Sequence, residues 1–583
     1  DDHMIIVQVP ICNILKLEKK PFIQFVEPIS PEPVKENYTG TTLIKMNQVH
    51  RDMSDGSVYS GRGINVMLQD DGIIGPHIDY TGRNTHFVTN NLGDHGDHVA
   101  GIIMGAGNLN PMHRGIAWGA KVNVYDASEA NYNNIPTLYN NLNITITSKS
   151  YAQACNGGYT AICNQLDKQA IDYPSLLHFL SAGNTGASNC GYGAGANWGN
   201  ITGGHKSAKN VIAVGNTDLN GVLNSSSSRG PATDGRIKPD ICAKGTSVMS
   251  TTSVDVDVSG YTSKTGTSMS CPMASGTMAV LYEAYKKWNG GALPYNALMK
   301  GIMMNTADDY GNPGPDFLYG YGIINGGRAL EVIKRKNYLI DSITQGGSKT
   351  HLINIPVGTK RVKIMVYWND REAASGAKPA IVNNINIQGE NNSNVHFPLR
   401  LDPKPTVASL STKAWEGIDS LNNVEQIVIN DPSGVCSLKV DGFSIPFGPQ
   451  KYCVIYDFIQ EGIRLTYPQG FEKWKPGDQE IVRWESQDTS SPITLRYSTN
   501  NGTTWNNIAS NISAKSRSYG FNVPNILTNQ FKVAILQNVD TDTSEQPSFV
   551  MNVPTGLTVQ KNCGDSMILS WPATTGAVGY IVY

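Results

Sequence analysis

The feature that most constrains the fold is an alternation of apolar, strand-like runs with helical segments between residues 60 and 335. Strands are expected at Ile64–Gln69, Lys121–Tyr125, Ile144–Ser150, Leu176–Leu180 and Val211–Val214, and helices at Val99–Met104, 268–286 and 293–306. Such an alternation predicts an α/β fold, with a parallel sheet covered by helices on both faces. In sheets of this kind the active site lies at the carboxyl ends of the strands.

Beyond residue 340 the helical pattern disappears. Segments such as Arg361–Trp368, Gln426–Ile429 and Ser437–Val440 have the length of strands and lie between turns. Because 583 residues also exceed what one core supports, we expect two to three β-sandwich modules after the α/β domain. Residues 28–45 are mostly polar and rich in proline at their start, which predicts a linker.

Charge and hydropathy exclude several classes of partner. The chain has 46 basic and 48 acidic residues and no basic run, so nucleic acid is not expected as a partner. No apolar run approaches the ~20 residues of a membrane helix. The first residues lack the basic and apolar regions of a signal peptide, so we expect the chain to begin partway into a longer precursor and to stop inside a module.

The nine cysteines cannot all pair with one another. Cys155–Cys190 is the preferred disulfide because both residues lie in loop-like sequence, and Cys155–Cys163 stays open as the alternative. Three further cysteines lie in apolar, strand-like sequence, where free buried thiols are expected: Cys242, Cys436 and Cys453.

Three short stretches carry residues suited to nucleophilic catalysis. Asp70 ends the first strand, His95 opens a helix within Gly93–Gly101, and Ser268 opens another within Thr265–Pro272. A serine hydroxyl becomes a nucleophile when an imidazole takes its proton, and a carboxylate holds that imidazole in the required tautomer. Each stretch alone is ordinary turn or capping sequence, and their joint occurrence in this order predicts a catalytic triad.

A fourth residue fits the same chemistry. Asn184 follows the buried strand Leu176–Leu180, where its amide is placed to donate to an oxyanion. A turn asparagine with left-handed backbone is the alternative.

These stretches resemble the subtilisin-like serine proteases, or subtilases. The segments that carry the resemblance are Asp70–Ile73, His95–Gly101, Ala182–Asn184 and Gly266–Pro272, with lesser landmarks at Gly115–Ala117, Ser228–Pro231, Lys238–Ile241 and Gly320–Asn325. The resemblance implies a serine endopeptidase that cleaves protein or peptide substrates through an acyl-enzyme on Ser268. Asp70 would orient His95, His95 would act as general base and acid, and Asn184 would complete the oxyanion hole.

The resemblance also implies a substrate cleft. Ser150, Tyr151 and Ala152 resemble the strand that pairs with substrate backbone, and Ala182 and Gly183 resemble the facing wall of the first specificity pocket. Pairing of this kind holds a peptide extended while pockets select its side chains. For Tyr151 the alternative is that it is an ordinary core residue without a role in substrate binding.

Flanking segments resemble modules of secreted bacterial members of the family. The expected domains are a propeptide remnant at 1–30, the catalytic domain at 31–340, a β-sandwich or barrel at 341–459, an immunoglobulin-like sandwich at 460–552 and a truncated fibronectin type III domain at 553–583. The chain is therefore expected to be a secreted or cell-surface zymogen, made with a signal peptide, whose β modules contact polymer or the cell surface.

Asp71 and Asp97 depart from the family pattern, since each replaces a small hydroxylated residue near the triad. Their charges are expected to raise the pKa of His95 and to shift activity toward mildly alkaline pH.

Two alternative functions stay open. A metal hydrolase would use Asp94, His95, Asp97 and His98, with His77 or His86 as a further ligand. A proteolytically inactive adhesin would use only the β modules. For the protease no cofactor is expected in catalysis, and a structural calcium ion at unknown ligands stays open.

Overall fold

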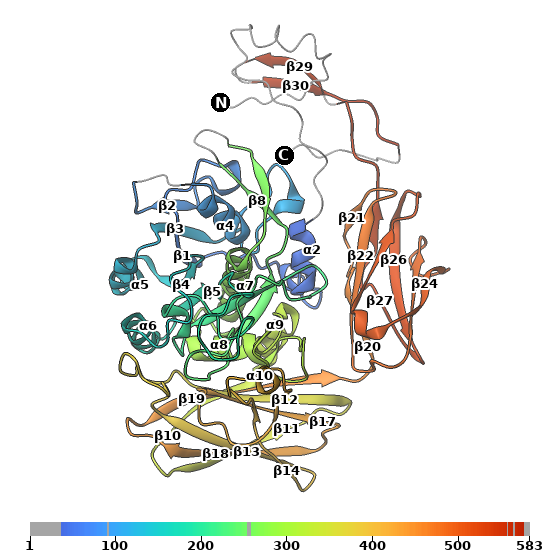
Figure 1. Cartoon of the computed structure of the whole chain (residues 1–583). Coiled ribbons are helices and arrows are strands. Elements are labelled where there is room, and N and C mark those ends of the chain that lie inside the picture. The colour runs from blue at the N-terminus through green and yellow to red at the C-terminus, as the bar shows by residue number, and fades with distance from the viewer. Residues whose placement is uncertain (1–35, 90–92, 254–257, 557, 564–565, 576–583) are drawn as a thin grey trace.

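The structure, a computed structural model, describes residues 36–89, 93–253, 258–556, 558–563 and 566–575. Its largest sheet has seven strands in the order β2-β3-β1-β4-β5-β6-β7, all parallel (Figure 1). In chain order these strands are β1 (Asn65–Asp70), β2 (Asn84–His86), β3 (Lys121–Asp126), β4 (Ile144–Lys149), β5 (Leu177–Ser181), β6 (Ile212–Thr217) and β7 (Ile241–Lys244). The predicted parallel α/β sheet is confirmed.

Helices cover both faces of this sheet. Phe179 of β5 joins the core beneath α7, whereas its neighbour Leu180 points the other way and joins the core beneath α6. Successive side chains of a strand alternate between faces, so the two helices lie on opposite sides. The helices of the domain are α4 (His95–Met104), α5 (Ile135–Leu142), α6 (Ala161–Asp172), α7 (Thr267–Trp288), α8 (Asn296–Asn305) and α9 (Gly326–Arg335). A short hairpin of β8 (Val248–Thr251) and β9 (Tyr261–Lys264) packs over α4.

The expected linker at residues 28–45 is wrong for its second half. Residues 36–50 form two helices, α2 (Glu36–Leu43) and α3 (Met46–His50). Ile44, Met46 and Val49 are fully buried in the main core, and α3 packs against α9. The segment forms helices despite its polar composition, because burying these apolar side chains against the helical layer stabilises the helices. The expected propeptide remnant at 1–30 lies outside the described residues.

A β-sandwich follows the α/β domain. Its two four-stranded sheets run β10-β19-β12-β17 and β11-β18-β13-β14 and enclose a separate apolar core. The strands are β10 (Tyr338–Ile343), β11 (Ser348–Asn354), β12 (Thr359–Tyr367), β13 (Asn384–Asn391), β14 (Asn394–His396), β17 (Val424–Asn430), β18 (Val435–Ser444) and β19 (Gln450–Gln460). A two-stranded sheet of β15 (Leu399–Arg400) and β16 (Trp415–Glu416) and the one-turn helix α10 (Val407–Leu410) lie in the connections. The sandwich packs on α8, where the Asn305 amide donates to the carbonyls of Lys363 and Ile455.

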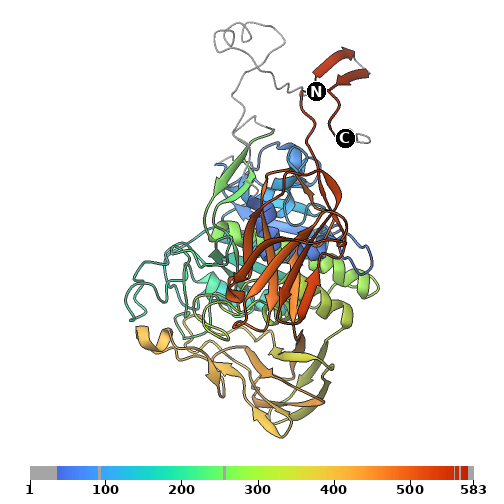
Figure 2. The ribbon, with the colours of Figure 1, turned by 90° about the vertical axis from the view of Figure 1, so that its right-hand side faces the viewer.

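A second, mainly antiparallel module stands beside the α/β domain in Figure 1 and in front of it in the turned view of Figure 2. A three-stranded sheet, β20-β22-β25, faces a sheet ordered β21-β28-β26-β23-β24 with β27 paired to β26, around Trp474 and Trp484. The strands are β20 (Ile463–Tyr467), β21 (Lys473–Trp474), β22 (Gln479–Ser486), β23 (Ile493–Ser498), β24 (Asn506–Ile512), β25 (Ser518–Asn522), β26 (Thr528–Gln537), β27 (Asp540–Thr543) and β28 (Ser548–Val550). Beyond it, β29 (Thr558–Cys563) and β30 (Ser566–Ser570) form a hairpin.

A buried ion network joins this second module to the α/β domain. Glu485 on β22 accepts from Arg328 of α9 at 2.9 Å and from the amide of Asn325 at 2.7 Å. Arg328 also pairs with Asp457 of the first sandwich at 3.1 Å, so one guanidinium ties three parts of the chain together.

Candidate active site

The candidate site lies at the carboxyl edge of the parallel sheet. Asp70 is the last residue of β1, Ser150 directly follows β4, and Asn184 lies three residues after β5. The register pairs Gln69 with Lys149, so Asp70 and Ser150 leave adjacent strands at the same level. Residues far apart in the sequence thereby meet at the edge where α/β sheets place their sites.

Asp70 and His95 form a close pair. His95 is the first residue of α4, and its Nδ1 lies 2.5 Å from Oδ1 of the buried Asp70. Burial acts to lower the pKa of His95, but the hydrogen bond and charge of Asp70, together with the charge of Asp71, outweigh it and raise this pKa above its ordinary value. With Nδ1 facing Asp70, Nε2 is the nitrogen left to act as a base.

Asp71 has a second role that the sequence pattern did not indicate. Its two carboxylate oxygens accept from the backbone N–H groups of His95 at 3.0 Å and Gly96 at 2.7 Å. These N–H groups are among those that a helix leaves unpaired at its start, so Asp71 caps α4 from outside the helix. The same carboxylate therefore fixes the backbone of His95 and raises the pKa of its ring.

Asp97 does not act on His95 as expected from the sequence. Its carboxylate is buried and turned toward the N–H of Gly75, at 2.6 Å, and the hydroxyl of Tyr80, at 2.8 Å. The carboxylates that raise the pKa of His95 are those of Asp70 and Asp71. Burial raises the pKa of Asp97 itself to about 6. The role of Asp97 is structural, because it anchors the segment that follows β1.

Asp71→Asn is expected to move the acidic limb of kcat/KM to lower pH by a few tenths of a unit. Removing the charge lowers the pKa of His95, which must be neutral to accept a proton, and water screens the effect at a side chain 34% exposed. Asp97→Asn is the control and leaves the limb in place. The pH profiles of both variants check this, and an unchanged or upward-shifted limb in Asp71→Asn contradicts it.

Ser268 is the second residue of α7, after Gly266 at its N-cap. Its hydroxyl donates to the carbonyl of Ser150 at 2.9 Å, while the Ser150 hydroxyl donates to the Ser268 carbonyl at 3.1 Å. Within the described ranges no hydrogen bond joins Ser268 to His95. The ion pair of Lys264 with Asp94, at 2.6 Å, ties the segment before Ser268 to the residue before His95. A rotation about the Ser268 Cα–Cβ bond would turn the hydroxyl away from the Ser150 carbonyl.

Asn184 is exposed, and its amide oxygen is held at the start of α7. Its Oδ1 accepts from the backbone N–H of Thr267 at 2.9 Å and from the Thr267 hydroxyl at 3.0 Å. With that oxygen occupied, both N–H groups of Nδ2 are left to donate, and Nδ2 makes no hydrogen bond to the described residues. Asn184 and the start of α7 thus place donors beside Ser268. Thr267 was not singled out from the sequence, although the Gly266–Pro272 motif contained it.

The two segments expected to bind substrate follow neighbouring strands of the sheet. Ser150, Tyr151 and Ala152 follow β4, and the buried Ala182 and Gly183 follow β5. Gly183 has a φ of +119°, and a side chain there would meet Thr202 Oγ1 at 2.2 Å. Both the backbone angle and the crowding require glycine at this position.

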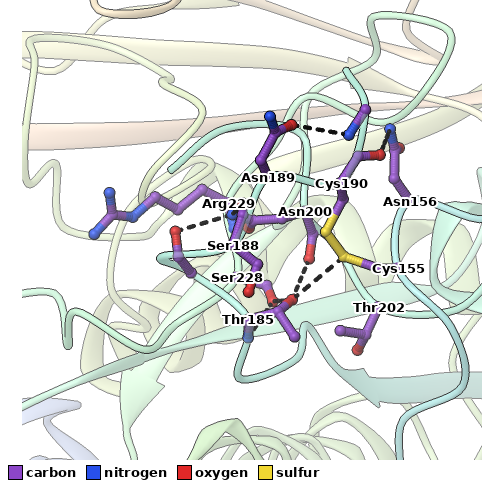
Figure 3. Close-up of a disulfide and its surroundings, with 12 residues drawn as sticks. Cys155, Asn156, Thr185, Ser188, Asn189, Cys190, Asn200, Thr202, Ser228 and Arg229 are labelled. Atoms are coloured by element: carbon purple, nitrogen blue, oxygen red, sulfur yellow. Dashed lines mark hydrogen bonds between the residues drawn. A yellow bond between two sulfur atoms is a disulfide. The ribbon is translucent and has the colours of Figure 1, made fainter. Parts of the chain in front are cut away.

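A disulfide joins the loops that continue from these two segments. Cys155 and Cys190 are bonded, and Thr185, directly after Asn184, lies beside the bridge (Figure 3). The preferred pairing is confirmed, and Cys163 is a free, buried thiol. The three cysteines expected as free buried thiols are so in the structure: Cys242, Cys436 and Cys453.

The metal-hydrolase alternative gains no support from the described residues, which contain no group of three or more His, Cys, Asp or Glu placed to hold a metal ion. His98 instead lies with Nε2 against the carbonyls of Val248, at 2.9 Å, and Thr262, at 3.0 Å. This places it as a structural link between α4 and the β8–β9 hairpin. In the same part of the chain, every helix is too short or too polar to span a bilayer.

Comparison with known proteins identifies the class. The sequence model of the Subtilase family, Peptidase_S8, matches residues 61–322. Those residues form a subtilase domain, the domain type of the subtilisin-like serine proteases.

Curated proteins with similar sequences match this part of the chain at low sequence identity. Subtilisin E of Bacillus subtilis (strain 168) is 27% identical over 331 residues, covering 54% of this chain and 76% of that protein. The serine protease/ABC transporter B family protein tagB of Dictyostelium discoideum is 26% identical over 313 residues, covering 40% of this chain. This chain spans only 16% of the length of tagB. Among solved structures, the prenylagaramide maturation protease PagA covers 46% of this chain and 93% of its own, with 24% identity and a TM-score of 0.38.

Proposed function

We propose that this protein is a secreted endopeptidase that forms an acyl-enzyme on Ser268. The observation that carries the proposal is the Asp70–His95 pair at 2.5 Å at the sheet edge where Ser268 meets Ser150. In the first step the Ser268 oxygen attacks the peptide carbonyl carbon, and His95 Nε2 takes the hydroxyl proton. The C–N bond then breaks as His95 returns that proton to the leaving amine. Water next attacks the ester, again through His95, and frees the acid and Ser268.

The other site residues take supporting roles in this proposal. Asp70 holds the His95 ring and stabilises it while it carries the proton. The Nδ2 of Asn184 donates to the oxyanion that forms during attack. Backbone groups of Ser150–Ala152 pair with the extended substrate, with Ala182–Gly183 opposite.

Export from the cytosol fits the Cys155–Cys190 disulfide, since such bonds persist in oxidising compartments. We further propose that the enzyme is made as a zymogen with a signal peptide, that residues 553–583 belong to a fibronectin type III module, and that the β modules contact a polymer or cell surface. A structural calcium ion also remains a proposal.

Labelling with a fluorophosphonate probe tests the function directly. The probe is expected to attach to the Ser268 hydroxyl, identified by mass spectrometry of the labelled peptide, and labelling is expected to require a neutral His95. Attachment elsewhere, or its absence in a folded protein that also fails to cleave denatured protein, contradicts the proposal.

Asn184→Ala is expected to lower kcat by about 10²–10³ with little change in KM, because the lost donor acts mainly on the transition state; the range comes from the corresponding asparagine of a subtilisin. Steady-state kinetics on one peptide substrate separate the two constants. A change confined to KM would instead place Asn184 in substrate binding.

A further inference from the structure

An open groove of about 1300 Å³ lies between the α/β domain and the module that contains β20–β28. Its first wall consists of residues 218–220, directly after β6, and of Lys244, Thr246 and Ser247 at the end of β7 and just beyond it. Its second wall belongs to β22, β23, β24 and β25. Small-molecule sites measure about 300–1,000 Å³, so this groove has room for a segment of a polymer chain.

The first wall continues the sheet edge that holds the candidate active site. Asp70, Ser150 and Asn184 follow β1, β4 and β5, and the first wall follows β6 and β7 of the same parallel sheet. Parallel strands all end at one edge, so the groove and the candidate catalytic groups share it.

The groove is connected to the candidate active site along the surface. The backbone N–H of Ser247 donates to the hydroxyl of Thr265 at 2.8 Å, and Ser268 follows Thr265 by three positions. Asn184, Thr265 and Ser247 are all exposed. A chain whose carbonyl lies at Ser268 can therefore reach the groove without passing through the core.

The second wall offers the free edge of a strand. β25 is the outer strand of the sheet β20-β22-β25, so among the described residues one of its edges has no strand beside it. All five residues of β25 line the groove. At about 3.3 Å per residue they offer roughly 16 Å of edge. A free edge binds an extended peptide through backbone hydrogen bonds, which favours a peptide as the occupant.

The surface of the groove is mainly uncharged. The register pairs Ile481 of β22 with Gly520 of β25, so the Ile481 side chain has no side chain beside it on β25. Of the charged residues that line the groove, Lys244 and Glu480 are buried, which leaves Asp218. Charged side chains of a bound chain would lose water here without gaining a partner, so neutral side chains fit the groove better.

Hydrogen bonds hold the two walls together. Arg483 of β22 donates to the carbonyl of Leu219 at 2.8 Å and to the hydroxyl of Thr42 at 3.0 Å. The ion pair of Arg328 with Glu485 joins the same two parts of the chain. The groove is thus built into the folded protein.

From this geometry we infer that the groove binds the part of a protein substrate that follows the cut bond, as an extended strand of neutral side chains paired with β25. The inference rests on the proposed peptidase function and adds a substrate class to it. The residues before the cut bond are assigned to Ser150–Ala152 and Ala182–Gly183, after β4 and β5. This leaves the β6–β7 end of the sheet for the residues after the cut bond. The enzyme thus favours long, unfolded chains over short peptides.

The kinetic test uses internally quenched peptides that share the residues before the cut bond. They carry after it either one neutral residue or about eight, enough to run along β25. The wild type is expected to cleave the long peptide with a kcat/KM about tenfold or more above that of the short one, because backbone hydrogen bonds to β25 add to binding. Asp at alternate positions of the long segment is expected to remove most of this gain. Equal kcat/KM for the short and the long neutral peptide overturns the inference.

Gly520→Tyr blocks the groove from within. Gly520 lacks the positive φ that would require glycine, and a Cβ there would meet only the carbonyl of Glu480, at 3.9 Å, so the strand can accept a side chain. The ratio of kcat/KM for the long to the short peptide is expected to fall to about one. Thr541→Tyr, at an exposed position of β27 away from the groove, is the matched control and keeps the ratio. An unchanged ratio in Gly520→Tyr overturns the inference, and Asn522→Tyr on the same strand replaces this variant should it fail to fold.

A binding test separates this inference from the proposed function. Fluorescence anisotropy on Ser268→Ala uses a labelled peptide that consists of the long neutral segment alone, so it needs no catalysis. Binding about tenfold tighter than to the double variant Ser268→Ala with Gly520→Tyr supports the inference even if the wild type cleaves nothing. Equal binding overturns it, as does binding of the neutral polysaccharide dextran with no binding of the peptide.

Discussion

Ser268→Ala is expected to lower kcat for peptide hydrolysis by a factor on the order of 10⁶, the loss found when the serine of subtilisin is removed. The loss is this large because Ser268, His95 and Asp70 act as one unit. Without the hydroxyl, His95 has no proton to take, and the remaining donors act on a reaction with water alone. Initial rates on a chromogenic peptide, with the variant prepared free of contaminating protease, measure the effect.

Ser275→Ala is the matched control on the same helix. The Ser275 hydroxyl is buried and donates to the Pro272 carbonyl at 3.2 Å, so its loss costs about 1 kcal/mol of stability and leaves kcat unchanged. More than roughly a hundredth of wild-type activity in Ser268→Ala would remove Ser268 from the role of nucleophile, because the expected loss is far larger.

Glu485→Gln is expected to reduce the free energy of unfolding by about 3–5 kcal/mol, because it leaves a buried guanidinium without its main partner. Arg328 lowers the pKa of Glu485 by its charge and hydrogen bond, against the opposing effect of burial, and Lys45 adds to this. In this variant Arg328 would keep only its ion pair with Asp457. We expect a lower Tm and faster proteolytic release of the module that contains β20–β28.

The same pair gives a pH dependence of definite sign. The pKa of Glu485 is lower in the folded protein than its ordinary value of 4.5. Its stabilisation is therefore complete above about pH 4.5 and is lost as the pH falls below that value toward the folded pKa. In Glu485→Gln this loss is absent. Glu461→Gln, an exposed partner of Lys360, is the control and should change stability by less than about 0.5 kcal/mol. Equal Tm values for both variants would mean that the network does not hold the module.

A chain ending near residue 460 is still expected to cleave peptides, since the candidate site draws on residues before 340. Such a chain lacks Glu485, so a lower stability is expected along with retained activity.

Features that depend on a few adjacent residues, such as strands and the residues at their ends, could be predicted from local sequence patterns. The apolar run Ile64–Gln69 predicted β1 and the position of Asp70 at its end, as the structure has them. The loop-like sequence around both cysteines favoured the Cys155–Cys190 disulfide, which the structure contains. The same reasoning failed for residues 36–45, because the burial of Ile44 depends on α9, nearly 300 residues away.

The sequence by itself therefore determined the α/β class, the order of Asp70, His95 and Ser268, and the strands that lead to them. Only the tertiary structure decided which way side chains point and what they meet. It turned Asp97 away from His95 toward Tyr80 and made Asp71 the cap of α4. The physical reason is that charge and hydrogen bonding act through space over a few ångströms, and the chain brings distant residues within that range only once it has folded.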